Sequence, residues 1–231
     1  LVKMKNLKLL DCTLRDGGYY NNWDFSIELI NEYLKSIYLS GIEYVEIGFR
    51  SFEQGSYKGP CAYTKDSFLA QLKIPKKLKI GVMINASEIV DSSKKNLIKK
   101  ISKLFPNSRD RINFVRIACH FKEVEKAVYA SNFLKKRGYK VIFNLMQCAD
   151  KTEKELSQAS KIISQYPIDV LYFADSMGSM TSDKMSFVIN SLKKNWKREI
   201  GIHTHDNMLR AFTNTDEAIK AVDIAAVNMI F

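Results

Sequence analysis

The residues Phe114-Val-Arg-Ile-Ala-Cys119 and Val141-Ile-Phe-Asn-Leu-Met146 are two largely apolar runs on either side of a helical stretch, Lys122–Arg137. Gly138 follows that stretch, and glycine commonly ends a helix because it accepts a left-handed backbone conformation. Apolar runs without strict alternation are typical of parallel strands that helices cover on both faces. The segment therefore predicts one strand–helix–strand unit of a parallel sheet.

The same unit recurs along the whole chain. Apolar runs predict eight strands, at Leu7–Cys12, Tyr44–Gly48, Lys79–Ile84, Phe114–Cys119, Val141–Met146, Val170–Ala174, Ile200–Thr204 and Asp223–Val227. Helical patterns lie between them, at Ser26–Ser40, Ser87–Phe105, Lys122–Arg137, from the capping box Thr152-Glu-Lys-Glu155 onward, at Ser182–Asn195 and at Met208–Ala221.

Eight such units in 231 residues predict an α/β fold of the (β/α)8 TIM-barrel type. An open doubly wound sheet is the alternative, but the first turn, Arg15-Asp-Gly-Gly18, is not the glycine-rich phosphate turn of that class. No linker divides the sequence, so we expect one catalytic barrel domain over 1–231. The pattern lacks the last helix, and we expect a C-terminally incomplete barrel whose strand-eight side is covered by a homo-oligomer contact, a partner or a lost segment.

Composition limits the classes of partner. The sequence is 46% hydrophobic, carries a net charge of +11, and has four widely spaced cysteines without a C-x-x-C pair. We interpret the cysteines as buried reduced thiols of a cytoplasmic protein. No apolar run approaches the roughly 18 residues of a membrane span. The lysines are spread thinly and the densest group, 94–103, has helical amphipathic spacing, so we expect an anionic small substrate and neither nucleic acid nor membrane as partner.

Polar residues gather at the predicted C-terminal strand ends, which is where barrel enzymes hold their active sites. They are Asp11, Thr13, Arg15, Asp16, Glu46, Asn85, Arg116, His120, Gln147, Asp175, Ser176, His203, His205, Asp206 and Asn207. No lysine ends a strand beside a helper group, which argues against a Schiff-base aldolase. No Ser-His-Asp or Cys-His triad is readable either.

The triplet His203-x-His205 is the sharpest of these features, because alternate residues of a strand face the same way. Two imidazoles make half of a divalent metal site. In a closed barrel only strand eight separates strands seven and one, and strand spacing is about 4.8 Å. Asp16 is therefore the best-placed carboxylate to complete the site. Two histidines and one carboxylate suit Mn²⁺, Mg²⁺, Fe²⁺ or Zn²⁺.

Four other residues have both a functional and a structural interpretation. Arg15 binds a carboxylate or a developing enolate oxygen, or else forms a salt bridge to Glu46 or Asp11. Ser176 binds a substrate carboxylate or caps a helix. Glu46 is a catalytic carboxylate or a partner behind the ligands, or else half of a structural ion pair. His120 contacts substrate or is a core histidine.

The motif Asp11-Cys-Thr-Leu-Arg15-Asp16-Gly resembles the opening motif of the DRE-TIM metallolyase superfamily. The chain is most similar to the 4-hydroxy-2-oxovalerate aldolase branch, through Val115-Arg-Ile-Ala-Cys-His120, Phe173-Ala-Asp-Ser-Met-Gly178 and Ile202-His-Thr-His-Asp-Asn207, with Asn214 beyond. The resemblance implies a metal held by Asp16, His203 and His205. It also implies that Arg15 neutralises a pyruvate enolate and that Ser176 helps to hold the substrate, and Glu46 matches the glutamate of the superfamily's second strand.

Two departures mark a divergent subgroup. Tyr19 stands where the aldolases have a proton-handling histidine, and a tyrosine with an ordinary pKa near 10 is a poor base at neutral pH. Tyr19, Tyr20 or a metal-bound water would have to substitute. The stretch Gly17-Gly-Tyr-Tyr-Asn-Asn-Trp23 suggests a substrate of its own. The glycine-rich segment after strand eight and the dehydrogenase-docking domain of the aldolases have no counterpart here, so channelling to a dehydrogenase is not expected.

These features together predict a class II aldolase, a metal-dependent carbon–carbon lyase. It would cleave or form a bond in a 4-hydroxy-2-oxo acid through a pyruvate enolate, with Arg15, Glu46 and Tyr19 as catalytic residues. Arg15, Ser176 and His120 would contact the 2-oxo acid. Mn²⁺ or Mg²⁺ is the expected cofactor, with Zn²⁺ or Co²⁺ as alternatives. An acyl-CoA lyase or synthase of the same superfamily, or an idle barrel that serves as a binding subunit, are the other functions considered.

Overall fold

The computed structural model describes residues 7–53, 55–106, 111–221 and 226–230. Its eight strands form a closed, TIM-barrel-like sheet in the order β1 to β8, and every neighbouring pair is parallel. The strands are β1 (Lys8–Asp11), β2 (Tyr44–Phe49), β3 (Lys79–Asn85), β4 (Phe114–Cys119), β5 (Lys140–Leu145), β6 (Val170–Asp175), β7 (Glu199–His205) and β8 (Ala226–Ile230).

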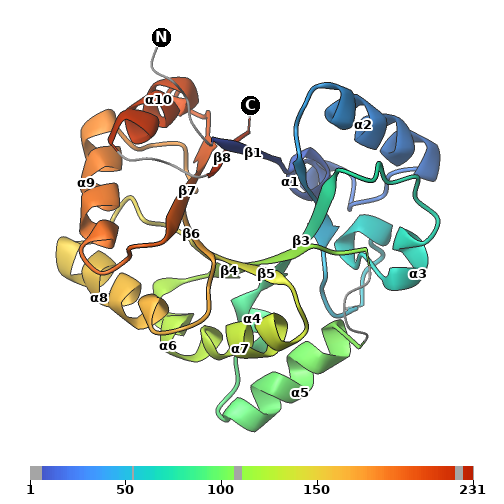
Figure 1. Ribbon diagram of the computed structural model, residues 1–231, viewed down its shortest axis with the longest axis horizontal. Coiled ribbons are helices and arrows are strands. Elements are labelled where there is room, and N and C mark those ends of the chain that lie inside the picture. The colour runs from blue at the N-terminus through green and yellow to red at the C-terminus, as the bar shows by residue number, and fades with distance from the viewer. Residues whose placement is uncertain (1–6, 54, 107–110, 222–225, 231) are drawn as a thin grey trace.

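Helices surround this sheet, as Figure 1 shows in a view down the barrel. They are α1 (Thr13–Gly17), α2 (Ile27–Leu39), α3 (Asp66–Leu69), α4 (Ala86–Ile89), α5 (Lys94–Leu104), α6 (Val124–Ala127), α7 (Tyr129–Lys136), α8 (Glu153–Ser164), α9 (Ser182–Lys193) and α10 (Ala211–Ala221). In the described part of the chain, α10 and α2 flank the β8–β1 side, and the short α1 lies between them at the end of β1 (Figure 1). No described helix is long and apolar enough to cross a lipid bilayer.

Two predicted helices are broken in the structure. The stretch Ser87–Phe105 is interrupted at Val90, whose backbone is extended, and the Ser93 side chain accepts a hydrogen bond from the Asn96 N–H to begin α5. Serine favours such a cap over a helix interior because its side chain competes for backbone hydrogen bonds. The stretch Lys122–Arg137 is likewise divided into a 3-10 turn (Phe121–Glu123), α6 and α7.

Two further boundaries differ from the sequence pattern. The predicted helix Met208–Ala221 begins at Ala211, because Leu209 has a left-handed backbone (φ 54°) and Asp206 Oδ1 accepts the hydrogen bond of Ala211 N–H. The predicted strand Asp223–Val227 begins in residues 222–225, which lie outside the described residues, and the observed strand continues to Ile230.

Large and small residues alternate inside the barrel. Aromatic rings of Phe114 and Tyr172 fill the space in front of Gly81 and Gly201, where an added Cβ would lie 2.0 and 2.4 Å from the rings. Glycine is therefore required at both positions for the barrel to close around its aromatic layer.

The four cysteines are buried thiols, as the sequence analysis predicted, and no disulfide joins them in the described structure. Burial raises the pKa of the Cys12 thiol to about 11 and that of Cys61 to about 12. The thiols therefore act as small apolar side chains of the core.

Candidate metal centre

The end of β7 and the turn after β1 bring three potential ligands together. His203 and His205 are alternate residues of β7 and face the barrel mouth, while Thr204 between them points the other way, 3.4 Å from Thr215 of α10. Asp16 lies in α1, which begins two residues after β1, and its N–H donates to the carbonyl of Cys12 at 2.9 Å. Closure of the sheet through β8 places α1 opposite the two histidines.

The three ligand atoms converge. Asp16 Oδ2 lies 3.7 Å from His203 Nε2 and 3.6 Å from His205 Nε2, and the two imidazole nitrogens are 3.2 Å apart. Atoms bound about 2.1 Å from one metal ion lie roughly 3.0 to 3.4 Å from one another. Asp16 Oδ2 is buried and has no hydrogen-bond partner among the described residues. A buried carboxylate oxygen without a partner fits a metal ligand, so the residues present suit a divalent cation.

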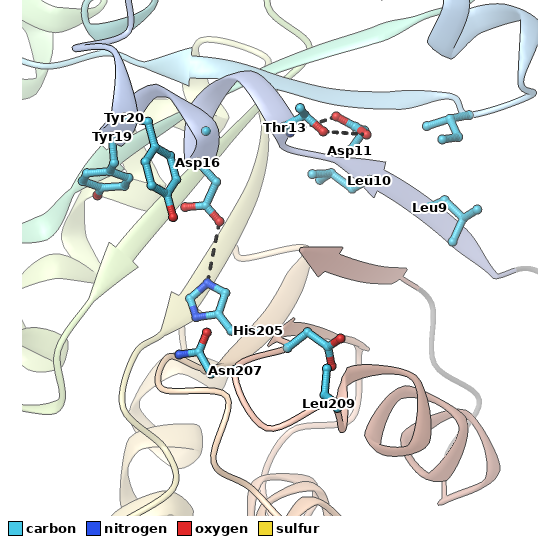
Figure 2. Close-up of a pocket in the computed structure, with 13 residues that line it drawn as sticks. Leu9, Leu10, Asp11, Thr13, Asp16, Tyr19, Tyr20, His205, Asn207 and Leu209 are labelled. Carbon is cyan, nitrogen blue, oxygen red and sulfur yellow. Dashed lines mark hydrogen bonds and ion pairs between the residues drawn. The ribbon is translucent and has the colours of Figure 1, made fainter. Parts of the chain in front are cut away.

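The protein orients one histidine through its second nitrogen. Nδ1 of His205 lies 2.8 Å from the backbone carbonyl oxygen of Ser176, which leaves Nε2 directed at Asp16 (Figure 2). A hydrogen bond of this kind selects the tautomer that binds metal ions. His203 is more deeply buried, and its Nδ1 has no hydrogen-bond partner among the described residues.

The electrostatics of the three groups differ. Burial, reinforced by the charges of Arg116 and Arg15, lowers the pKa of His203 well below its usual range. The neighbouring Asp16 carboxylate raises the pKa of His205. Burial by itself would raise the pKa of Asp16, but His205 and Arg15 outweigh it and hold that pKa below its usual value. Near neutral pH the site therefore offers a carboxylate and one neutral imidazole directly.

Arg15 joins this centre to the barrel interior. Its side chain is buried, Nη1 donates to Asp16 Oδ1, and Nε donates to Glu46 Oε1 at 2.7 Å. Trp23 Nε1 donates to the Arg15 backbone carbonyl at 2.7 Å, which fixes the main chain at this point. Nη2 is buried and has no partner among the described residues. The predicted salt bridge to Glu46 is therefore present, and one guanidinium donor remains for an anion.

Glu46 of β2 lies beneath this layer and is fully buried. Arg116 of β4 donates to it twice, from Nε to Oε2 at 2.7 Å and from Nη2 to Oε1 at 2.6 Å. Sequence reasoning placed Arg116 at a strand end but gave it no role. The available signal was an arginine in the apolar run of β4, because a buried guanidinium needs a buried anion.

A cavity of about 910 Å³ opens beside the ligands (Figure 2). Asp16 and His205 line it together with the tyrosines at 19 and 20, and its other lining residues are Leu9, Leu10, Asp11, Thr13, Gly17, Ile42, Asp206, Asn207 and Leu209. The Tyr19 ring packs edge-on against Trp23, with centroids 4.7 Å apart. Burial raises the pKa of Tyr19, so its phenol keeps its proton at neutral pH.

The two other predicted substrate contacts, Ser176 and His120, are not among the residues that line this cavity. Ser176 Oγ accepts a hydrogen bond from the Gln147 N–H at 3.1 Å, and Thr181, not Ser176, caps α9. His120 follows β4, where its N–H donates to Glu123 Oε2 at 3.0 Å. The described contacts of His120 do not join it to the three candidate metal ligands.

The sequence of the chain is similar to those of known proteins. The sequence model of the HMGL-like family matches residues 6–222. The 4-hydroxy-2-oxovalerate aldolase of Geobacillus thermodenitrificans is 26% identical over 220 residues, which cover 94% of this chain and 61% of that protein. A candidate 2-isopropylmalate synthase of Archaeoglobus fulgidus is 25% identical over 219 residues, which cover 94% and 42%. The chain thus spans about three fifths and about two fifths of these relatives.

A solved structure agrees with both the fold and the sequence match. The N-terminal domain of a candidate aldolase from Bacteroides vulgatus superposes with a TM-score of 0.83 at 28% identity, over 96% of this chain and 72% of that one. The resemblance to the metallolyase superfamily that the motifs indicated is therefore confirmed.

Proposed function

The chain belongs to the HMGL-like family, and on that premise we propose that it is a divalent-metal-dependent aldolase. Its substrate would be a 4-hydroxy-2-oxo acid, cleaved to pyruvate and an aldehyde or formed from them. One observation carries the proposal: Asp16 Oδ2, without a hydrogen-bond partner in the described structure, converges with two imidazole nitrogens beside the unpartnered Nη2 of Arg15.

Asp16, His203 and His205 would hold the cation, and Mn²⁺ or Mg²⁺ suits a set of one carboxylate and two imidazoles with open positions. When bound, such an ion supplies Lewis-acid polarisation of a keto oxygen and lowers the cost of enolate formation.

The protein's own residues would stabilise the charge that develops during bond cleavage. In the cleavage direction the 4-hydroxyl group would pass its proton to a water molecule in the cavity and become the carbonyl group of the aldehyde. The C3–C4 bond breaks, and the electron pair of that bond forms the enolate of pyruvate. Arg15 Nη2, which has no hydrogen-bond partner in the described structure, would donate to the negative charge that develops on this enolate, and its burial would strengthen that interaction.

Proton transfer completes the reaction at C3 of the enolate. Tyr19 lines the cavity beside Asp16 and, since its pKa is raised, it is suited to donate a proton and not to accept one. Ser176 accepts the Gln147 N–H through Oγ, so its own hydroxyl proton remains available for a substrate carboxylate.

The test uses the purified chain, stripped of metal and reloaded with Mn²⁺. Pyruvate release from 4-hydroxy-2-oxo acids is followed together with the metal content of the protein. We expect one Mn²⁺ per chain and turnover that requires it, with both lost in His203→Ala. Stoichiometric metal without turnover of any 4-hydroxy-2-oxo acid would refute the aldolase assignment, and absence of metal binding would favour an idle barrel.

An acyl-CoA lyase or synthase is the second candidate, because the Archaeoglobus relative is named as a synthase at nearly the same identity as the aldolases. Condensation assays with pyruvate and with acetyl-CoA as rival donors separate the two functions. Activity with acetyl-CoA alone would replace the first candidate by the second.

A further inference from the structure

Three buried side chains form a continuous ion network behind the metal centre. Arg116 lies in the middle of β4 with its guanidinium 5.4 Å from the centroid of the Tyr172 ring. It donates to both oxygens of Glu46, at 2.7 and 2.6 Å. Glu46 Oε1 in turn accepts the Arg15 Nε–H at 2.7 Å. Strands β4 and β2 are thus tied to α1 through side chains alone.

We propose that Arg116 is a positioning residue that sets the guanidinium of Arg15 through Glu46. The inference rests on the proposed function in one respect, namely that the anion which Arg15 meets is the substrate. Glu46 acts in the same way, because both of its oxygens already accept hydrogen bonds from arginine.

Geometry explains why an arginine is needed at position 116. A guanidinium donates two parallel hydrogen bonds to one carboxylate, which fixes the rotation of the carboxylate as well as its place. With Glu46 fixed in this way, Nε of Arg15 has a defined acceptor, Nη1 lies on Asp16, and Nη2 is the donor left over. A lysine at 116 would keep the charge but would leave the carboxylate free to turn.

Charge balance gives the network its second property. Two guanidinium groups meet one carboxylate at Glu46, and the Asp16 carboxylate restores neutrality. Removal of a whole charge would leave a buried ion without its partner and would threaten folding. The informative change is therefore Arg116→Lys, which keeps the charge and removes the paired geometry.

Arg50 supplies a matched control. It is also a buried arginine, directly follows β2, and donates to the carbonyl of Thr64 and to Asp66. It stacks on Phe105 with the guanidinium 5.0 Å from the ring centroid, and no described contact joins it to Arg15. Arg50→Lys therefore measures what the loss of a buried guanidinium does to the fold alone.

The first experiment needs neither metal nor substrate. The Nε–H resonance of Arg15 is assigned by NMR, and its exchange with water is measured. We expect slow exchange in the wild type and in Arg50→Lys, and a shifted signal with exchange at least about tenfold faster in Arg116→Lys, because the hydrogen bond to Glu46 is loosened. An unchanged Arg15 signal in Arg116→Lys would overturn the proposal, whatever reaction the protein catalyses.

The second experiment connects the network to the substrate anion. Oxalate, which resembles the enolate of pyruvate, is titrated into the Mn²⁺-loaded protein. We expect its affinity to fall about tenfold in Arg116→Lys and to stay within about twofold in Arg50→Lys. In the Arg15→Lys background, which also keeps the charge, Arg116→Lys should have no further effect, because residues that act through one another are not additive.

The outcomes separate the two hypotheses. Equal losses from Arg116→Lys in the wild-type and Arg15→Lys backgrounds would show that Arg116 only stabilises the fold, and would overturn the positioning role. A wild type that binds neither Mn²⁺ nor oxalate would refute the proposed function, while the NMR result would still decide the link between Arg116 and Arg15.

Discussion

Asp16 and Asp175 stand at the same barrel mouth, each near the C-terminal end of a strand, and their surroundings are opposite. Both oxygens of Asp175 accept backbone hydrogen bonds, from Ser179 N–H at 3.0 Å and from Met180 N–H at 3.1 Å. Asp16 uses one oxygen for Arg15, and the other has no partner in the described structure and faces two imidazoles. A carboxylate at a strand end is therefore a ligand candidate only where an unsatisfied oxygen meets other ligand atoms.

The largest expected effect comes from replacing each of the two aspartates in turn by asparagine, which removes the negative charge. In Asp16→Asn the affinity for Mn²⁺ should fall by at least about 100-fold, since a ligand matters more than the partners behind it, which by themselves are worth about 10- to 100-fold. Asp175→Asn should bind Mn²⁺ like the wild type and unfold more easily. Calorimetric titration with Mn²⁺ and urea unfolding measure the two effects, and equal metal loss in both variants would contradict the distinction.

Substitution of Arg15 should give the next largest effect. Its Nη1 donates to Asp16, whereas its Nη2 has no hydrogen-bond partner in the described structure. In Arg15→Ala we expect kcat to fall by roughly 10²–10³, as for loss of an oxyanion donor, while about one Mn²⁺ per chain stays bound. Steady-state kinetics and metal analysis of the same preparation test this. Wild-type turnover in the variant would remove Arg15 from the mechanism.

Within the candidate metal centre, the two histidines differ in the pKa of their imidazole groups. Asp16 raises the pKa of His205 above 6.5, whereas burial holds that of His203 well below 6.5. A metal ion must therefore displace one proton near neutral pH, and the affinity for Mn²⁺ should rise about tenfold per pH unit up to the pKa of His205 and level off above it. Titration in buffers with different heats of ionisation should show about one proton released per ion. Release of two protons would contradict the neutral state of His203.

The same shift has a consequence for the metal-free protein. A raised pKa of His205 stabilises the folded state fully below pH 6.5, and this contribution is lost as the pH rises through the folded-state pKa. Melting curves without metal should therefore show a small loss of stability on that rise, which saturating Mn²⁺ reverses because it binds the folded state.

The smallest expected effect distinguishes the role of the Ser176 hydroxyl group from that of its backbone carbonyl. Ser176→Ala removes an acceptor for the Gln147 N–H and should cost about 1 kcal/mol of stability. Affinity for Mn²⁺ should stay within about twofold, because alanine keeps the carbonyl that orients His205. A higher KM for the 2-oxo acid would support the proposed contact between Ser176 and the substrate carboxylate. A loss of metal binding would contradict the conclusion that only the backbone carbonyl of Ser176 orients His205.

Much of the site was readable from local patterns. The alternation of His203 and His205 on one strand placed both imidazoles on one face, and the structure brings them within 3.2 Å of each other. The choice of Asp16 followed from barrel closure, which the sheet order confirms. The helix interruption at Val90 was missed, because a serine cap inside a helical pattern competes with the periodicity and only packing decides between them.

The sequence by itself determined the order of strands and helices, the family and the choice of three candidate metal ligands, because those depend on spacing along the chain. Only the tertiary structure decided that Arg116 lies on Glu46, that Glu46 lies on Arg15, and that Asp175 is occupied by backbone N–H groups while Asp16 is not. The physical reason is that hydrogen-bond satisfaction in a buried network depends on side chains 31 and 70 positions apart in the sequence, which meet only when the barrel closes.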